Sequence, residues 1–158
     1  MKTLILLRHG KSEDPSLLKS DFKRGLKQKG IDDIEKVCHH FKALGYSPDK
    51  VLCSTARRTR ETFDEFSKHY PSSIPVEYID NLYHASASKI LEYINKNIYT
   101  LDCLMVVGHN FGISKLAEYL CIGGCEDLST SGMVIIQFDD LIEPGLGTKL
   151  HYIKPKLI

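Results

Sequence analysis

The sequence has no apolar stretch close to the roughly 20 residues that are needed to cross a bilayer. Its first apolar residues are too few to form a signal peptide. It also lacks a basic tail and any run of lysine and arginine, and its formal net charge is only +1. A strongly basic surface is the usual footprint of nucleic-acid binding. We therefore expect a cytoplasmic protein that binds neither a membrane nor nucleic acid.

Paired metal-ligand motifs are lacking as well. Among the five cysteines, only Cys121 and Cys125 lie close together in the sequence. A structural zinc site needs a second pair of ligands at a similar spacing, and no such pair is present. Most of the cysteines lie in apolar segments, as reduced cysteines do in protein cores. We therefore predict reduced cysteines, no metal ion and no cofactor.

Internal repeats, low-complexity segments and linkers are absent too. The 158 residues are enough for one hydrophobic core, so we expect a single domain over residues 1–158. Strand-like and helix-like segments alternate along the chain, which is typical of α/β layer structures. The sequence therefore predicts a single-domain three-layer α/β/α sandwich with a mostly parallel central sheet.

Short apolar runs predict the strands of this sheet, and apolar residues at helical spacing predict the helices. The expected strands are residues 4–7, 51–53, 76–79, 104–107, 133–138 and 149–153. The expected helices are residues 31–44, a helix capped by Ser54 that ends before Pro71, residues 91–98, and residues 113–120. Glycines at 45 and at 123–124 are expected to end the first and the last of these helices.

Two of the predicted strands end in residues that suit phosphate chemistry. The run 4–7 stops at Arg8 and His9, and the run 104–107 is followed closely by His109. In open α/β sheets, ligands bind beyond the carboxyl ends of the strands, so these side chains are expected at one site. Arginine offers a fixed fork of donors for phosphate, and a neutral imidazole is a competent nucleophile near pH 7. The pattern indicates phosphoryl transfer through a phosphohistidine intermediate.

Three arginines, Arg57, Arg58 and Arg60, fall in the first turn of the second predicted helix. Cations at a helix N-terminus oppose the helix macrodipole, and a dianionic phosphate nearby would reverse that cost. Runs of charge usually lie on a solvated face, and we expect this for Arg57 and Arg60. One arginine is expected to face the phosphate.

The order of the motifs resembles the histidine phosphatase superfamily. The superfamily motifs are Arg8-His9-Gly10, Ser54-x-x-x-Arg58-x-x-x-Thr62 and Val107-Gly108-His109-Asn110. Over essentially its full length the chain is similar to the small protein phosphohistidine phosphatases of that superfamily. The segments that carry this similarity are Arg8-His9-Gly10-Lys11-Ser12, Asp21-Phe22-Lys23-Arg24-x-Leu26, Leu82-Tyr83-His84-Ala85-Ser86 and Pro155-Lys156. The resemblance implies a phosphoglycerate mutase-like fold.

The resemblance also implies roles for four residues. His9 would attack phosphorus, while Arg8, Arg58 and His109 would hold the phosphoryl oxygens without a metal ion. His9 must then be neutral, with its other ring nitrogen donating to a backbone carbonyl or a carboxylate. His109 is expected to act in its protonated form, which the bound dianion would keep charged beside the arginines.

Four further residues are candidates for substrate binding. Arg24 lies where the family places another phosphate-facing arginine, although an ordinary surface arginine would give the same pattern. Lys11 and Ser12 directly follow the nucleophile and can donate to the substrate. Asn110 can contribute its amide or can simply cap the next helix.

The sequence departs from the wider superfamily at the general acid. Phosphomonoesterases and mutases of the superfamily carry a glutamate in the segment that here spans residues 78–84, and this chain has none there. Asp80 and His84 are the alternatives for this role, and each can equally be an ordinary turn residue. An alkoxide needs a proton to leave, whereas a protonated phosphoramidate releases a neutral imidazole. The missing glutamate therefore favours phosphohistidine over sugar or glycerate phosphates.

The sequence thus predicts a phosphatase that acts on phosphohistidine in a signalling or phosphocarrier protein. No insertion is long enough to form the lid that a mutase needs, so hydrolysis is expected. A small-molecule phosphomonoesterase is the alternative among enzymes. A phospho-binding regulatory module with little turnover is the alternative from another class.

Overall fold

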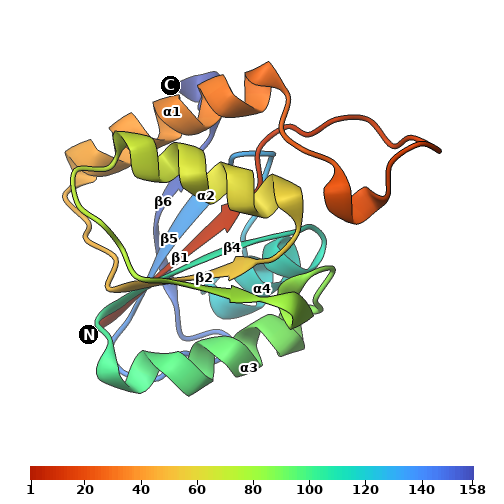
Figure 1. The fold of residues 1–158 in the computed structure, drawn as a ribbon. Coiled ribbons are helices and arrows are strands. Elements are labelled where there is room, and N and C mark those ends of the chain that lie inside the picture. The colour runs from red at the N-terminus through yellow and green to blue at the C-terminus, as the bar shows by residue number, and fades with distance from the viewer.

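The computed structural model describes residues 1–158 and has a six-stranded sheet between two layers of helices (Figure 1). The strand order is β3-β2-β4-β1-β5-β6. Strands β1 to β4 run parallel to one another, whereas β5 is antiparallel to both of its neighbours. The strands are β1 (Lys2–Arg8), β2 (Lys50–Ser54), β3 (Val76–Ile79), β4 (Cys103–Gly108), β5 (Met133–Phe138) and β6 (Thr148–Ile153). The predicted three-layer architecture with a mostly parallel sheet is confirmed.

Helices cover both faces of the sheet (Figure 1). One face carries α1 (Gln28–Leu44) and α2 (Arg57–His69), and the other carries α3 (Ala87–Asn97) and α4 (Gly112–Leu120). None of these helices has the length and apolar composition of a membrane span.

Burial on both faces explains why the central strands read as unbroken apolar runs. In β1, Leu4 and Leu6 pack into the cluster that includes the apolar residues of α3 and α4. Ile5 and Leu7 point the other way, into the cluster that includes those of α1 and α2. All four side chains are fully buried. Because successive side chains of β1 point to opposite faces of the sheet, this one strand contributes to both halves of the core.

The four predicted helices are present, but α1 begins at Gln28 instead of residue 31, and α3 spans Ala87–Asn97 instead of residues 91–98. Gly45 follows α1 with a φ of 84°, a left-handed conformation that glycine adopts without strain. The prediction that Ser54 caps α2 is wrong, because Ser54 is the last residue of β2 and the N-cap of α2 is Ala56. The side chain of Ser54 instead contacts His109. Its hydroxyl therefore belongs to the site at the strand ends.

The cysteines are all unpaired, as expected from their apolar surroundings. Four of them are buried, and only Cys125 is half-buried. Burial raises the pKa of Cys38 to about 11. A thiol with a raised pKa is a poor nucleophile, so Cys38 is a packing residue.

Candidate active site

The two histidines come together because β1 and β4 are adjacent. Arg8 at the end of β1 lies opposite Gly108 at the end of β4, so His9 and His109 leave the sheet side by side. The backbone N–H of His9 donates to the carbonyl of Gly108 at 3.1 Å. The two imidazole ring centroids are 5.3 Å apart. The expected meeting of these strand ends is thus present in the structure.

The start of α2 adds one arginine to this place. Arg58 is only 2% exposed, whereas Arg57 and Arg60 are exposed. Arg57 instead pairs with Glu61 one turn further along the helix, with 3.1 Å between Nε and Oε2. Adjacent helical residues point in different directions, so only one of the three arginines turns inward. That residue is Arg58.

A single cavity of about 330 Å³ connects these residues. Its lining is polar or charged apart from Pro15. It includes all eight predicted catalytic and substrate-binding residues: Arg8, His9, Lys11, Ser12, Arg24, Arg58, His109 and Asn110. Such a polar cavity with several cationic side chains suits a small, strongly charged anion.

Five buried side-chain atoms have no partner within the protein, and three of the five belong to residues that line the cavity. These three are Nε of Arg8, Nε of Arg58 and Nδ1 of His109. Buried polar atoms are almost always hydrogen-bonded, and the exceptions require an explanation. An oxyanion with several acceptor oxygens, such as a phosphoryl group, is a ligand with suitable partners for these atoms.

His9 is held in the protonation state of a nucleophile. Its Nδ1 lies 2.8 Å from the carbonyl oxygen of Gly10, which can only accept a hydrogen bond. Nδ1 therefore carries the proton, and Nε2 keeps its lone pair. Burial, and then the charges of Arg58 and Arg8, lower the pKa of His9 to about 4. The Gly10 N–H donates to Thr62 Oγ1 at 2.9 Å, which fixes the loop to α2.

His109 is positioned by Ser54. Nε2 of His109 lies 2.8 Å from Ser54 Oγ, and that oxygen already accepts from the backbone N–H of Ala56 at 3.3 Å. The hydroxyl of Ser54 has one proton, which it can donate to Nε2, and in that tautomer the imidazole proton is on Nδ1. Burial, together with His9 and Arg58, lowers the pKa of His109 well below its ordinary value. Without a bound anion His109 is therefore neutral and can donate through Nδ1. Its protonation in the presence of a phosphoryl dianion stays a prediction.

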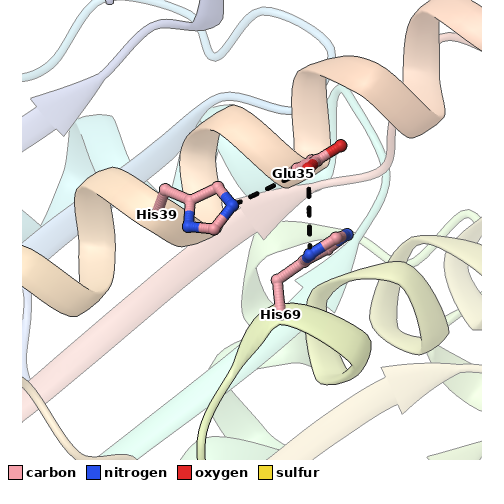
Figure 2. A group of neighbouring side chains, drawn as sticks. All are labelled: Glu35, His39 and His69. Atoms are coloured by element: carbon pink, nitrogen blue, oxygen red, sulfur yellow. Dashed lines mark ion pairs between the residues drawn. The ribbon is translucent and has the colours of Figure 1, made fainter.

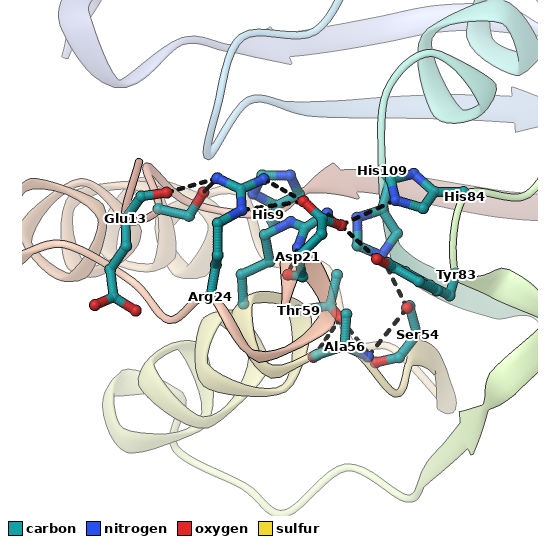
Figure 3. Close-up of polar contacts among 12 residues, drawn as sticks. His9, Glu13, Asp21, Arg24, Ser54, Ala56, Thr59, Tyr83, His84 and His109 are labelled. Atoms are coloured by element: carbon teal, nitrogen blue, oxygen red, sulfur yellow. Dashed lines mark hydrogen bonds and ion pairs between the residues drawn. The ribbon is translucent and has the colours of Figure 1, made fainter. Parts of the chain in front are cut away.

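Asp21, which the sequence analysis gave no role, organises the arginines (Figure 3). It begins a short 3-10 helix, Asp21–Lys23. Its Oδ1 accepts from Nη2 of Arg24 at 2.7 Å, and its Oδ2 accepts from Nη2 of Arg58 at 3.1 Å. The backbone carbonyl of Asp21 accepts from Nη1 of Arg58 at 2.8 Å. Asp21 therefore fixes the orientation of both guanidinium groups.

The same carboxylate also holds the loop that follows β3. Tyr83 donates its hydroxyl to Oδ2 of Asp21, and Nε2 of His84 lies 3.0 Å from that oxygen. Burial alone would raise the pKa of Asp21, but the hydrogen bonds from Tyr83, Arg24 and His84 together hold it well below its usual range. Asp21 therefore stays ionised at neutral pH and has no proton to give.

The two alternatives for a general acid lie in different places. His84 lines the cavity, and its backbone has the left-handed φ of 52°, which is uncommon for a residue with a side chain. Asp80 does not line the cavity and accepts from Thr55 Oγ1 at 2.8 Å. Of the two, only His84 is placed to meet a leaving group.

Two further candidates for substrate binding, Ser12 and Asn110, also line the cavity. The hydroxyl of Ser12 accepts from Nη1 of Arg24 at 3.3 Å. Asn110 is not the N-cap of α4, which is Phe111. Its side-chain oxygen instead accepts from the hydroxyl of Ser114 in the first turn of α4. The alternative of a helix-capping Asn110 is therefore wrong, and its side-chain nitrogen donates to the carbonyl of Leu128 at 3.4 Å.

The depressed pKa of His9 predicts a pH dependence of stability. The folded protein protonates His9 near pH 4 rather than at the ordinary 6.5, so the unfolded chain binds more protons between these values. Folding stability should fall as the pH drops from 6.5 to 4, and the share due to His9 is about 3 kcal/mol. Urea unfolding at pH 7 and pH 4 should therefore show a smaller decline in a His9→Gln variant than in wild type. Equal declines would contradict the assignment.

Comparison with known proteins agrees with this geometry. A model of the histidine phosphatase superfamily (branch 1) matches residues 4–116. An uncharacterised protein of Mycobacterium tuberculosis is 30% identical over 163 residues, covering 95% of this chain and all of the relative. The crystal structure of a putative phosphohistidine phosphatase SixA from Agrobacterium tumefaciens has a TM-score of 0.83 at 25% identity, with 98% and 99% of the two chains covered. A putative α-ribazole-5′-P phosphatase from Escherichia coli shares the fold, with a TM-score of 0.73 at 16% identity over 98% of each chain.

Proposed function

Since the chain belongs to the histidine phosphatase superfamily, we propose that it hydrolyses phosphohistidine on a protein through a phosphorylated intermediate at His9. One observation carries the chemistry: a neutral buried imidazole lies among buried donors that have no partner in the protein. Such preorganised donors stabilise the charge of a transferring phosphoryl group without reorganisation.

The first step transfers the phosphoryl group to the enzyme. Nε2 of His9 attacks phosphorus while the bond from phosphorus to the substrate imidazole breaks. The other nitrogen of that imidazole is already protonated, so the leaving group departs neutral. Arg8, Arg58 and His109 donate to the phosphoryl oxygens throughout, and the reaction as proposed uses no metal ion.

The second step returns His9 to its starting form. Water attacks the phosphorus, the bond to Nε2 breaks, and the proton of the water leaves with inorganic phosphate. The Nδ1–H of His9 stays on the carbonyl of Gly10, so the imidazole again departs neutral. The same donors serve both steps.

The carboxylates around the cavity favour this substrate over an alkyl phosphate. Asp21 is held ionised by its hydrogen bonds. The backbone N–H of Gly25 and the Lys19 ammonium lower the pKa of Glu13, and Asp14 pairs with Lys27 at 3.4 Å. None of these groups supplies the proton that an alkoxide requires. A phosphoramidate does not need that proton.

Exposed apolar side chains near the cavity support a protein as the substrate. Leu17 and Leu18 are fully exposed in the loop that leaves the cavity at Pro15, and this loop projects from the body of the protein (Figure 1). On another segment, Phe111 is 78% exposed directly beside Asn110 of the lining. Apolar side chains around a polar pocket are typical of protein interaction surfaces.

A small-molecule phosphomonoesterase is the second candidate. The α-ribazole-5′-P phosphatase shares the fold, and His84 occupies a position from which it can protonate an ester oxygen. The two candidates differ in what they require of the leaving group, which makes them separable by experiment.

The leaving-group requirement gives a testable order of substrates. Values of kcat/KM should be highest for a phosphohistidine peptide, lower for p-nitrophenyl phosphate, whose phenolate leaves without a proton, and lowest for a sugar phosphate. Neither His84→Gln nor Asp80→Asn should change phosphohistidine hydrolysis by more than about twofold, because neither residue protonates that leaving group. His84→Gln should reduce any activity on the sugar phosphate.

The measurement is steady-state hydrolysis of the three substrates by wild type and both variants. Asp80→Asn is the matched control, because Asp80 follows the same strand but does not line the cavity. A sugar phosphate as the best substrate, lost in His84→Gln, would favour the small-molecule enzyme. Binding of phosphate without turnover of any substrate would favour a phospho-binding module.

A further inference from the structure

A second cluster of ionisable side chains lies on α1 and α2 (Figure 2), and none of its residues lines the cavity. Glu35 and His39 are one helical turn apart on α1, and His69 is the last residue of α2. Oε1 of Glu35 is 3.7 Å from Nε2 of His39 and 4.0 Å from Nδ1 of His69. One ligand atom from each residue lies within 4.8 Å of the other two. The two helices thus present three converging donor atoms.

These distances are close to those of a metal site. In a tetrahedral zinc centre, bonds of about 2.0–2.2 Å place neighbouring ligand atoms about 3.4 Å apart. Each donor atom therefore needs to move by less than about 1 Å to bind one ion. The side chains of Glu35 and His39 are about half exposed, at 48% and 54%, so they can make this movement without disturbing the core.

We propose that Glu35, His39 and His69 form a binding site for a divalent transition-metal ion, best represented by Zn²⁺. Two imidazoles and one carboxylate are a ligand set that zinc accepts, and the position is open for water to complete the coordination. His69 lies in the last turn of α2, where the helix macrodipole favours a positive charge. The bound ion would supply that charge and connect α2 to α1.

The site is separate from the phosphatase site. His69 and Arg58 lie at opposite ends of α2, 11 residues apart, which corresponds to about 16 Å along the helix axis. The ligands of the proposed metal site come from two different helices, so they do not form a recognisable metal-binding motif in the sequence. The prediction of no metal ion from the cysteine spacing did not address this surface.

A simpler interpretation is that Glu35 only attracts the imidazoles when they are protonated. In that case the three side chains form only surface ion pairs, which contribute little to stability. The two interpretations differ in one measurable property, which is whether the protein binds zinc at these three residues at neutral pH.

The test is a zinc titration of the full chain after treatment with a chelator, at pH 7.5 and in competition with a chromophoric zinc indicator. Wild type should bind one Zn²⁺ that is lost or weakened at least about tenfold in His39→Gln and in His69→Gln, since loss of a direct ligand costs at least as much as loss of its supporting residue. His40→Gln is the matched control, because His40 is equally exposed on α1 but is not part of the cluster. It should bind as wild type does.

A second readout tests the link between the helices. Zinc at about 100 times the wild-type dissociation constant should raise the Tm of wild type by about 8 °C, and that of His69→Gln by no more than about half as much. Phosphatase activity without zinc should be the same in both proteins, so failure of this proposal leaves the proposed function untouched. The proposal is overturned if wild type binds no zinc, or if His39→Gln and His69→Gln bind it as tightly as wild type does. The latter result would place the ion at the cavity histidines or the cysteines.

Discussion

Replacement of His9 by alanine is expected to abolish hydrolysis of every phosphorylated substrate, with a loss of at least about 10⁴-fold in kcat, the scale seen when a covalent nucleophile is removed. In the proposed mechanism Nε2 of His9 forms the only bond between enzyme and phosphorus, and no neighbouring group can replace it. Nδ1 of His109, which has no partner within the protein, carries the proton in the tautomer in which Ser54 donates to Nε2. A protonated nitrogen has no lone pair for attack.

The variant should still fold, because His9 follows the last residue of β1 and belongs to neither hydrophobic cluster. Circular dichroism and thermal unfolding should therefore resemble those of wild type at pH 7. Rapid quenching of wild type with a radiolabelled substrate should trap a phosphoenzyme that is labile in acid and stable in base, and His9→Ala should give none. His40→Ala, on the exposed face of α1, is the matched control. Turnover by His9→Ala above one hundredth of the wild-type rate would refute the mechanism.

The main features of the fold and the meeting of the two histidines could be predicted because they depend on local patterns. The strands β1 and β4 are buried on both faces and therefore read as continuous apolar runs. The carboxyl ends of parallel strands meet at one edge of the sheet, so His9 and His109 could be placed together before any coordinates were known. Their 5.3 Å separation follows from the adjacency of the two strands.

The surroundings of the histidines could not be predicted in the same way. Asp21 contacts Arg58 and Tyr83, which are 37 and 62 residues away, and no periodic pattern reports such contacts between loops. Ser54 was expected to cap a helix, since serine usually does so at a strand-to-helix turn. The helix starts two residues later, which frees the Ser54 hydroxyl to orient His109. The choice between these two roles depends on the neighbouring strand, which the local sequence does not contain.

Arg58 should be the arginine of α2 whose loss does most damage. Arg58→Ala is expected to lower kcat/KM by at least about a hundredfold, the scale of losing one preorganised charge stabiliser. Its guanidinium is almost fully buried and is held by both the carboxylate and the backbone carbonyl of Asp21. Its Nε has no partner within the protein, which leaves it available to a phosphoryl oxygen. Arg57 has an exposed side chain, pairs with Glu61 and does not line the cavity.

The test of this prediction compares the kcat/KM of variants at Arg57 and Arg58, two neighbouring arginines with different surroundings. Arg57→Ala should keep kcat/KM within about threefold of wild type, since the loss of an exposed ion pair has little energetic effect. Arg58→Lys keeps the charge but not the planar fork of donors, so its kcat/KM should lie between those of Arg58→Ala and wild type. Because Arg58 is buried, the Tm of each variant must be measured, and Arg58→Lys provides a folded alternative if alanine destabilises the chain. If Arg57→Ala proves as harmful as Arg58→Ala in folded protein, the assignment of the phosphate-binding arginine on α2 is wrong by one position.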